Sequence, residues 1–180
     1  MEFWRLLTPA DFFVVGILVV AVYTDVRTQK IPNVLTFGGM AVALVVHPVL
    51  ALIQQDAGAM FPAFLNSFAG ILAAFVPGFL FWNLGGAMKA GDAKLLMVIG
   101  AILGPFEVLR VFVLVLLVQI PVGFVQLWRS GRLRSLFRVL KAGIFRKPDG
   151  PAPMTAPFAS VIAAGYLLSR IFPHFFRFWS

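Results

Sequence analysis

The chain has 180 residues, of which 61% are hydrophobic and 12% are charged, and its mean hydropathy is +0.95. Soluble domains contain about 45–50% apolar and about 25% charged residues. The composition therefore excludes an ordinary water-soluble domain and predicts an all-α, polytopic integral membrane protein that forms one domain over residues 1–180.

The 15 Lys and Arg residues outnumber the 7 Asp and Glu residues, which gives a net charge of +8. Basic residues gather in the cytoplasmic loops of membrane proteins, so this excess does not indicate nucleic-acid binding. The chain has no cysteine, which excludes disulfides, thiol catalysis and thiolate metal sites. We expect no metal and no cofactor.

The first predicted helix begins near Thr8, where Pro9 suits the first helical position and Asp11 the positive end of the helix dipole, and it ends near Val26. No small-residue cleavage pattern follows it, so we expect the helix to be retained. The remaining predicted spans, in chain order, are 34–53, 61–84, 95–103, the stretch from a turn at 104–110 to Trp128, and 156–172.

The apolar stretch from Leu95 to Trp128 is too long for a single span. As one helix it would measure about 50 Å, against a hydrocarbon core of about 30 Å. Its flanks, Lys94 and Arg129, are both basic and favour the same side of the membrane. The stretch is therefore predicted to form a hairpin that turns at 104–110.

About six crossings result, with both termini on the periplasmic side. The predicted cytoplasmic loops, 25–33, 85–94 and 129–155, contain 11 of the 15 basic residues, and the outside segments contain the other 4. This asymmetry predicts a multi-pass protein of the bacterial inner membrane with these loops in the cytoplasm.

Two of the seven acids have no local explanation. We interpret Asp11 as a helix-start residue and Glu107 as a turn residue with Arg110 as its partner, and the other acids that we assign to termini, loops and turns are Glu2, Asp56 and Asp149. Asp25 and Asp92 remain. The predicted topology places both at the same depth on the cytoplasmic face.

Two carboxylates at one depth suit an aspartyl protease, in which the ionised acid activates a water and the protonated acid polarises the peptide carbonyl. Gly91 leaves room for a peptide backbone beside Asp92. The alternative is that each acid pairs with a nearby base and only holds a helix end. The candidate partners are Arg27 or Lys30 for Asp25, and Lys89 or Lys94 for Asp92.

Three segments resemble motifs of the type IV prepilin peptidases. Asp25 to Asn33, which includes Arg27 and Ile31-Pro32-Asn33, is similar to the first motif, and Gly91-Asp92-Ala93-Lys94-Leu95 is similar to the second. Residues 153–159, which include Pro157, resemble a proline-rich segment at the start of the family's last span. The three segments occur in the family's order.

The resemblance implies a GxGD-type aspartyl endopeptidase that removes short basic leaders from prepilins and pseudopilins at the cytoplasmic face. Asp25 and Asp92 would be catalytic. The residues implied to support them or to start helices and the substrate loop are Gly91, Lys94, Arg27, Lys89, Pro32, Asn33 and Pro157. Without cysteines or room for the methylating domain of larger members, the chain resembles the peptidase-only branch associated with tight-adherence (Tad) pili.

Lys89 stands where the family has the first glycine of its motif. Because it lies three residues before Asp92, we expect its charge to favour the ionised form of Asp92 and to leave the shared proton on Asp25.

The expected partners are prepilin or pseudopilin substrates and the lipid bilayer, and the oligomeric state is left open. Two other functions remain: a catalytically inactive membrane scaffold of a pilus or secretion machine, and a small transporter. The absence of a charged residue in the middle of any span disfavours the transporter.

Overall fold

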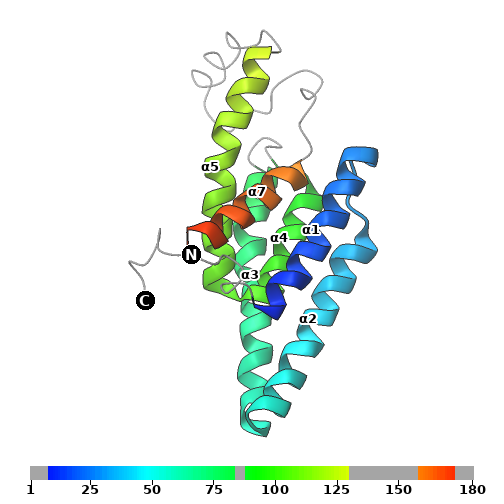
Figure 1. Cartoon of the computed structure of the whole chain (residues 1–180), viewed down its shortest axis with the longest axis vertical. Helices are drawn as coiled ribbons and strands as arrows, with labels where there is room; N and C mark the ends of the chain where they lie inside the picture. Colours follow the sequence, from blue (N-terminus) through cyan, green and yellow to red (C-terminus); the bar gives the residue numbers. More distant parts are fainter. Residues whose placement is uncertain (1–7, 84–87, 130–157, 173–180) are drawn as a thin grey trace.

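The computed structural model describes residues 8–83, 88–129 and 158–172, and within these ranges the chain is helical, without strands. The helices, shown in Figure 1, are α1 (Pro9–Thr28), α2 (Asn33–Gln54), the short 3-10 helix η2 (Ala57–Ala59), α3 (Met60–Asn83), α4 (Ala90–Leu103), α5 (Pro105–Arg129) and α7 (Phe158–Ile171). The all-α prediction is confirmed, and each predicted span corresponds to one of the six α-helices in the described ranges.

The predicted hairpin in the long apolar stretch is present at Gly104. This residue ends α4 with a φ of 88°, a left-handed conformation that favours glycine, and Pro105 begins α5. A Cβ atom on Gly104 would also lie 2.7 Å from the side-chain amide nitrogen of Asn66. The turn therefore depends on glycine for its conformation and for space.

Four helical segments within the described residues are long and apolar enough to cross a membrane: Pro9–Thr28, Asn33–Gln54, Ala57–Asn83 and Pro105–Val125. Helix α7 is a shorter apolar helix. Their outward side chains are largely Val, Phe, Leu and Ile, as a hydrocarbon solvent requires. These features identify a polytopic membrane protein.

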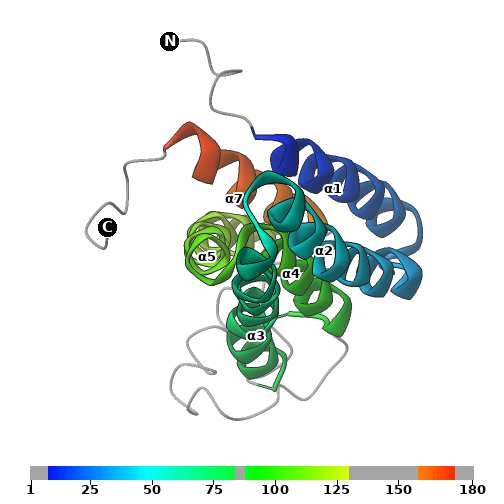
Figure 2. The same cartoon turned by 90° about the horizontal axis from the view of Figure 1, so that it is seen from below.

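Helix α4 is the inner helix of the bundle. It contacts every other described α-helix, and Figure 2 shows it between α5 and α1, next to α2 and α3. With 14 residues it is about 21 Å long. Gly70 of α3 and Gly100 of α4 bring the two backbones together so closely that a Cβ atom on either would overlap the other's carbonyl group. The first turn of α4 is therefore surrounded by other helices of the bundle.

Candidate active site

Asp25 lies in the last turn of α1 and is 2% exposed. Its Oδ2 atom accepts a hydrogen bond of 3.1 Å from the backbone N–H of Ala159, in the first turn of α7. The N-terminus of a helix carries a partial positive charge and unsatisfied N–H groups. Helix α7 therefore stabilises negative charge on Asp25, although the two residues are 134 positions apart.

Asp92 lies in the first turn of α4 and is also 2% exposed. Its Oδ2 atom accepts a hydrogen bond of 3.1 Å from the backbone N–H of Lys89, the residue before the helix. This turn comes before the apolar part of α4 and outside the four long candidate spans. Gly91 faces Ile31, and a Cβ atom there would make an ordinary contact of 3.5 Å.

Asp25 and Asp92 line one small polar cavity with a volume of about 290 Å³. The other lining residues are Gln29, Lys30, Ile31, Asn33, Lys89, Gly91 and Lys94. The cavity thus contains residues from both sequence motifs, which topology alone had placed only at the same depth. It joins the end of α1 to the beginnings of α2 and α4.

Burial raises the pKa of Asp92 to about 7, and repulsion from the Asp25 carboxylate acts in the same direction. The Lys89 N–H and the Lys89 charge oppose this shift but are outweighed by the combined effects that raise it. Lys89 lowers the pKa of Asp92, as expected. The expectation that Asp92 would be the ionised acid is wrong, because burial raises its pKa by more than the lysine lowers it. Near neutral pH, Asp92 retains a proton for a large fraction of the time.

The alternative ion pairs do not form among the described residues, where the salt bridges involve only Asp11 and Glu107 as acids. Lys94 instead donates a hydrogen bond of 2.9 Å to the side-chain oxygen of Asn33 and lies 4.9 Å from the centre of the Phe37 ring. Lys94 therefore links the second motif to the first, and Asp92 makes no salt bridge among the described residues.

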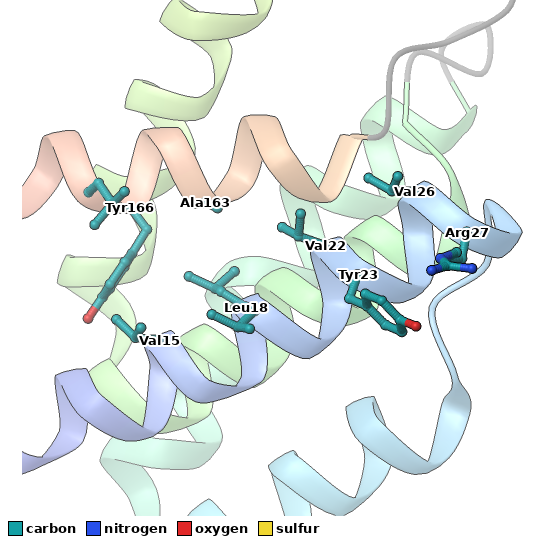
Figure 3. A pocket seen from close by; sticks show the side chains of 10 residues that line it. Val15, Leu18, Val22, Tyr23, Val26, Arg27, Ala163 and Tyr166 are labelled. Atoms are coloured by element: carbon teal, nitrogen blue, oxygen red, sulfur yellow. The ribbon is translucent and has the colours of Figure 1, made fainter.

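Arg27, which was expected to support the acids, and Pro32, which was expected to start a helix or the substrate loop, do not line the cavity. Arg27 stacks over the ring of Tyr23 at 5.4 Å and lines a separate apolar groove between α1 and α7, shown in Figure 3. Pro32 precedes α2 and lines a different groove. Pro157 lies outside the described residues.

The motif at 153–159 marked the start of the last span, but it did not predict that the backbone N–H of Ala159 would contact Asp25. The contact between Ala159 and Asp25 uses a backbone N–H, which any residue except proline supplies, so no side-chain pattern marks it. The role of Asp11 was also missed, because a local helix-start pattern does not reveal a distant partner. By contrast, the expected pair of Glu107 and Arg110 is present, at 3.5 Å.

A protein-family model, described as the type IV leader peptidase family, matches residues 12–124. This match covers more than half of the chain and includes both Asp25 and Asp92. The chain belongs to the type IV leader peptidase family. Comparisons with curated proteins and with solved structures gave no match.

Proposed function

We propose that the chain is a membrane aspartyl endopeptidase that removes the short basic leader from prepilins or pseudopilins at the cytoplasmic face of the bacterial inner membrane. The observation that carries this proposal is the pair of buried acids, Asp25 and Asp92, which line one polar cavity and have no salt-bridge partner among the described residues. A helix-capping role alone does not require two acids at one cavity.

Asp25 is the general base in this mechanism, because the Ala159 N–H and the positive end of α7 favour its charged form. It takes a proton from a water molecule, whose oxygen attacks the carbonyl carbon of the scissile peptide bond. Asp92 gives its proton to the carbonyl oxygen, which produces a neutral tetrahedral intermediate. Asp25 then gives its proton to the departing amine, and Asp92 recovers its own as the carbonyl forms again.

The charges at the two ends of the bundle support a cytoplasmic position for the cavity. Arg27, Lys30, Lys89 and Lys94 lie at the cavity end of the described bundle, without a salt bridge to a described acid. At the opposite end, Arg110 and Arg170 pair with acids. Unpaired basic residues are retained on the cytoplasmic side, which therefore holds Asp25 and Asp92 in this proposal.

Cleavage of a prepilin by the purified protein tests the proposal. Asp25→Asn and Asp92→Asn are each expected to lower the cleavage rate by at least about a thousandfold, and the double variant is expected to be no slower, because the acids act as one unit. Asp56→Asn is a matched control, since Asp56 also accepts a backbone N–H at a helix start but is exposed. Cleavage at the wild-type rate by either single variant would contradict the mechanism.

The Tad-pilus assignment is tested by the choice of substrate. We expect cleavage of a prepilin from a tight-adherence pilus and an unmodified new N-terminus, because the chain resembles the peptidase-only branch of the family. If the wild-type protein cleaves no prepilin but is required for pilus assembly, the inactive-scaffold alternative replaces this proposal.

A further inference from the structure

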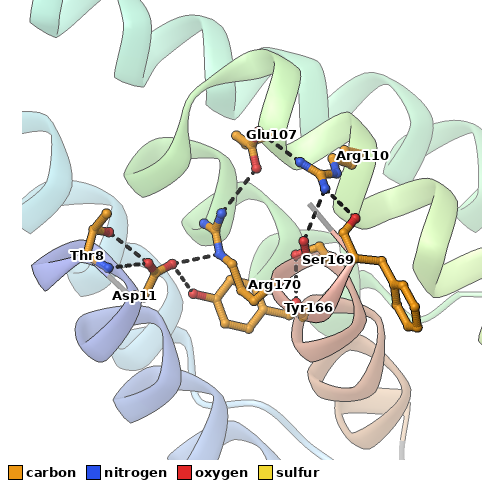
Figure 4. Close-up of polar contacts among 8 residues, drawn as sticks. Thr8, Asp11, Glu107, Arg110, Tyr166, Ser169 and Arg170 are labelled. Carbon is orange, nitrogen blue, oxygen red and sulfur yellow. Dashed lines mark hydrogen bonds and ion pairs between the residues drawn. The ribbon is translucent and has the colours of Figure 1, made fainter. Parts of the chain in front are cut away.

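A second group of polar residues lies at the opposite end of α1 from the cavity, shown in Figure 4. Asp11 is 1% exposed and accepts hydrogen bonds from the hydroxyl of Tyr166 at 2.6 Å and the backbone N–H of Thr8 at 2.7 Å. The Nε atom of Arg170 lies 2.8 Å from the same carboxylate. Tyr166 itself is fully buried. Asp11 therefore binds α7 by two side chains from successive turns.

The group continues from α7 to α5. Arg170 also pairs with Glu107 at 3.3 Å, and Glu107 pairs with Arg110 at 3.5 Å. Arg110 donates hydrogen bonds to the backbone oxygens of Ser169 and Phe172, at 3.2 Å and 2.7 Å, where α7 ends. The last turn of α7 is thus fixed to both α1 and α5.

Helices α1 and α7 are antiparallel, and α1 binds α7 through one buried acid at each end. Asp11 and Asp25 are 14 residues apart, which is close to four helical turns, so they lie on nearly the same face of α1 and about 21 Å apart along it. Ala159 and Tyr166 are seven residues apart, close to two turns, and share a face of α7. The two polar contacts together define one register between the helices.

Apolar packing between the two contacts is incomplete. A groove of about 460 Å³ separates α1 from α7 there, lined by apolar residues such as Val15, Val22 and Leu167. Figure 3 shows these helices crossing with the groove between them. Lipid tails are as apolar as these side chains, so burial in the membrane gives little drive for the helices to close or to keep their register. The polar contacts, which are directional, therefore set the register between α1 and α7.

We propose that Asp11, Tyr166 and Arg170 are positioning residues, which fix the register of α7 on α1 and thereby hold the Ala159 N–H against the Asp25 carboxylate. This inference rests on the proposed function, because it gives the contact at Asp25 a role in peptide cleavage. The close approach of Gly165 to the backbone of Val115 fixes α7 on α5 and does not replace the contact with α1.

Tyr166→Phe tests the inference with a small change, because it removes one hydroxyl and keeps the buried ring. We expect the kcat for prepilin cleavage to fall about fivefold to tenfold with KM changed less than twofold. The charged groups that line the cavity with Asp25, which are Asp92, Lys89, Lys94 and Lys30, are unchanged by this substitution. Tyr23→Phe, on the exposed face of α1, is the matched control.

Asp11→Asn provides a second variant, with Asp56→Asn as its control. Both acids accept a backbone N–H at a helix start, but Asp11 alone of the two contacts α7. We expect Asp11→Asn to reproduce the lower kcat with KM changed less than twofold, and Asp56→Asn to leave both at their wild-type values. Arg170→Lys, which keeps the charge, should restore more activity than Arg170→Met.

The readouts separate positioning from a purely structural role. If Tyr166→Phe and Asp11→Asn lower only the yield or the melting temperature, while the kcat and KM of the folded enzyme stay at wild-type values, the inference is wrong. If the wild-type protein cleaves no prepilin, the proposed function fails instead.

Discussion

Each end of the bundle has a buried acid in the first turn of a helix, but the two acids have different surroundings. Asp11 lies in the first turn of α1 and Asp92 in the first turn of α4, and each accepts the backbone N–H of the residue before its helix, Thr8 or Lys89. Both side chains are almost fully buried, at 1% and 2% exposure. Local sequence and burial do not distinguish these two acids.

Their partners distinguish them. Asp11 faces Arg170 and the Tyr166 hydroxyl, so its charge is compensated inside the protein. Asp92 faces the acid Asp25 across a polar cavity, and burial raises its pKa to about 7. A buried acid in a salt bridge holds helices together, whereas two buried acids that share a cavity and make no salt bridge retain a proton that can take part in catalysis.

The largest expected difference between the two ends of the bundle is the side of the membrane from which each can be labelled. The chain has no cysteine, so single substitutions report accessibility directly. Thr28→Cys and Ala90→Cys, at the cavity end, should react with a membrane-impermeant thiol reagent only after the cells are opened. Gly58→Cys, in the turn between α2 and α3, should react once the outer membrane alone is permeabilised. Labelling of Ala90→Cys from outside would place the cavity on the wrong side for leader cleavage.

Removing the cation from the Asp11 end should cause the largest loss of stability. Arg170→Met leaves Asp11 buried without a charged partner, and such changes cost about 3 kcal/mol or more. Thermal unfolding in detergent measures the loss. Arg27→Met is the matched control, because Arg27 is exposed and stacks only on the Tyr23 ring, a contact worth about 0.5 kcal/mol. If Arg170→Met and Arg27→Met lost the same stability, Asp11 would not depend on its salt bridge with Arg170, and this account of the Asp11 end would be wrong.

Neutralising the acid at the other end should have the opposite effect on stability. The pKa of Asp92 is raised in the folded protein, so the folded state binds the proton more tightly and its stability falls as pH rises from about 4 to about 7. Asp92→Asn imitates the protonated acid. It should therefore raise the free energy of unfolding by about 4 kcal/mol at pH 8.5, because the pKa of Asp92 is raised by about three units, and have little effect at pH 4. A destabilised Asp92→Asn protein at pH 8.5 would indicate that Asp92 is a structural acid like Asp11.

Lys89 offers the smallest change. Its charge opposes the rise in the pKa of Asp92, so Lys89→Ala should raise that pKa further and move the basic limb of the pH–rate profile to higher pH, by less than about one unit because salt screens the charge. Lys89→Arg should restore the wild-type limb. An unchanged limb in Lys89→Ala would mean that the lysine does not act on the acid pair.

The sequence predicted those parts of the molecule that depend on turn residues or on the distribution of charged residues along the chain. Glycine and proline at 104 and 105 marked the hairpin, and the count of basic residues placed Asp25 and Asp92 at one depth. It did not predict that α7 donates a backbone N–H to Asp25, because that contact joins residues 134 positions apart without a side-chain signal.

The protonation of the site was also beyond the sequence. Lys89 suggested an ionised Asp92, because the spacing of a lysine and an acid is visible in the sequence and the degree of burial is not. Asp11 was interpreted as a helix-start residue for the same reason, since Tyr166 lies 155 positions away. In both cases the tertiary environment decides the chemistry of the acid.

The most direct test of this account is the protonation state of Asp92, followed by infrared titration of the purified protein. We predict a carbonyl band of a protonated carboxylic acid that disappears with a midpoint near pH 7. The band should be absent in Asp92→Asn and should remain in Asp11→Asn. A band that disappears near pH 4, or one that Asp92→Asn leaves unchanged, would show that the cavity does not hold the proton required by the proposed mechanism.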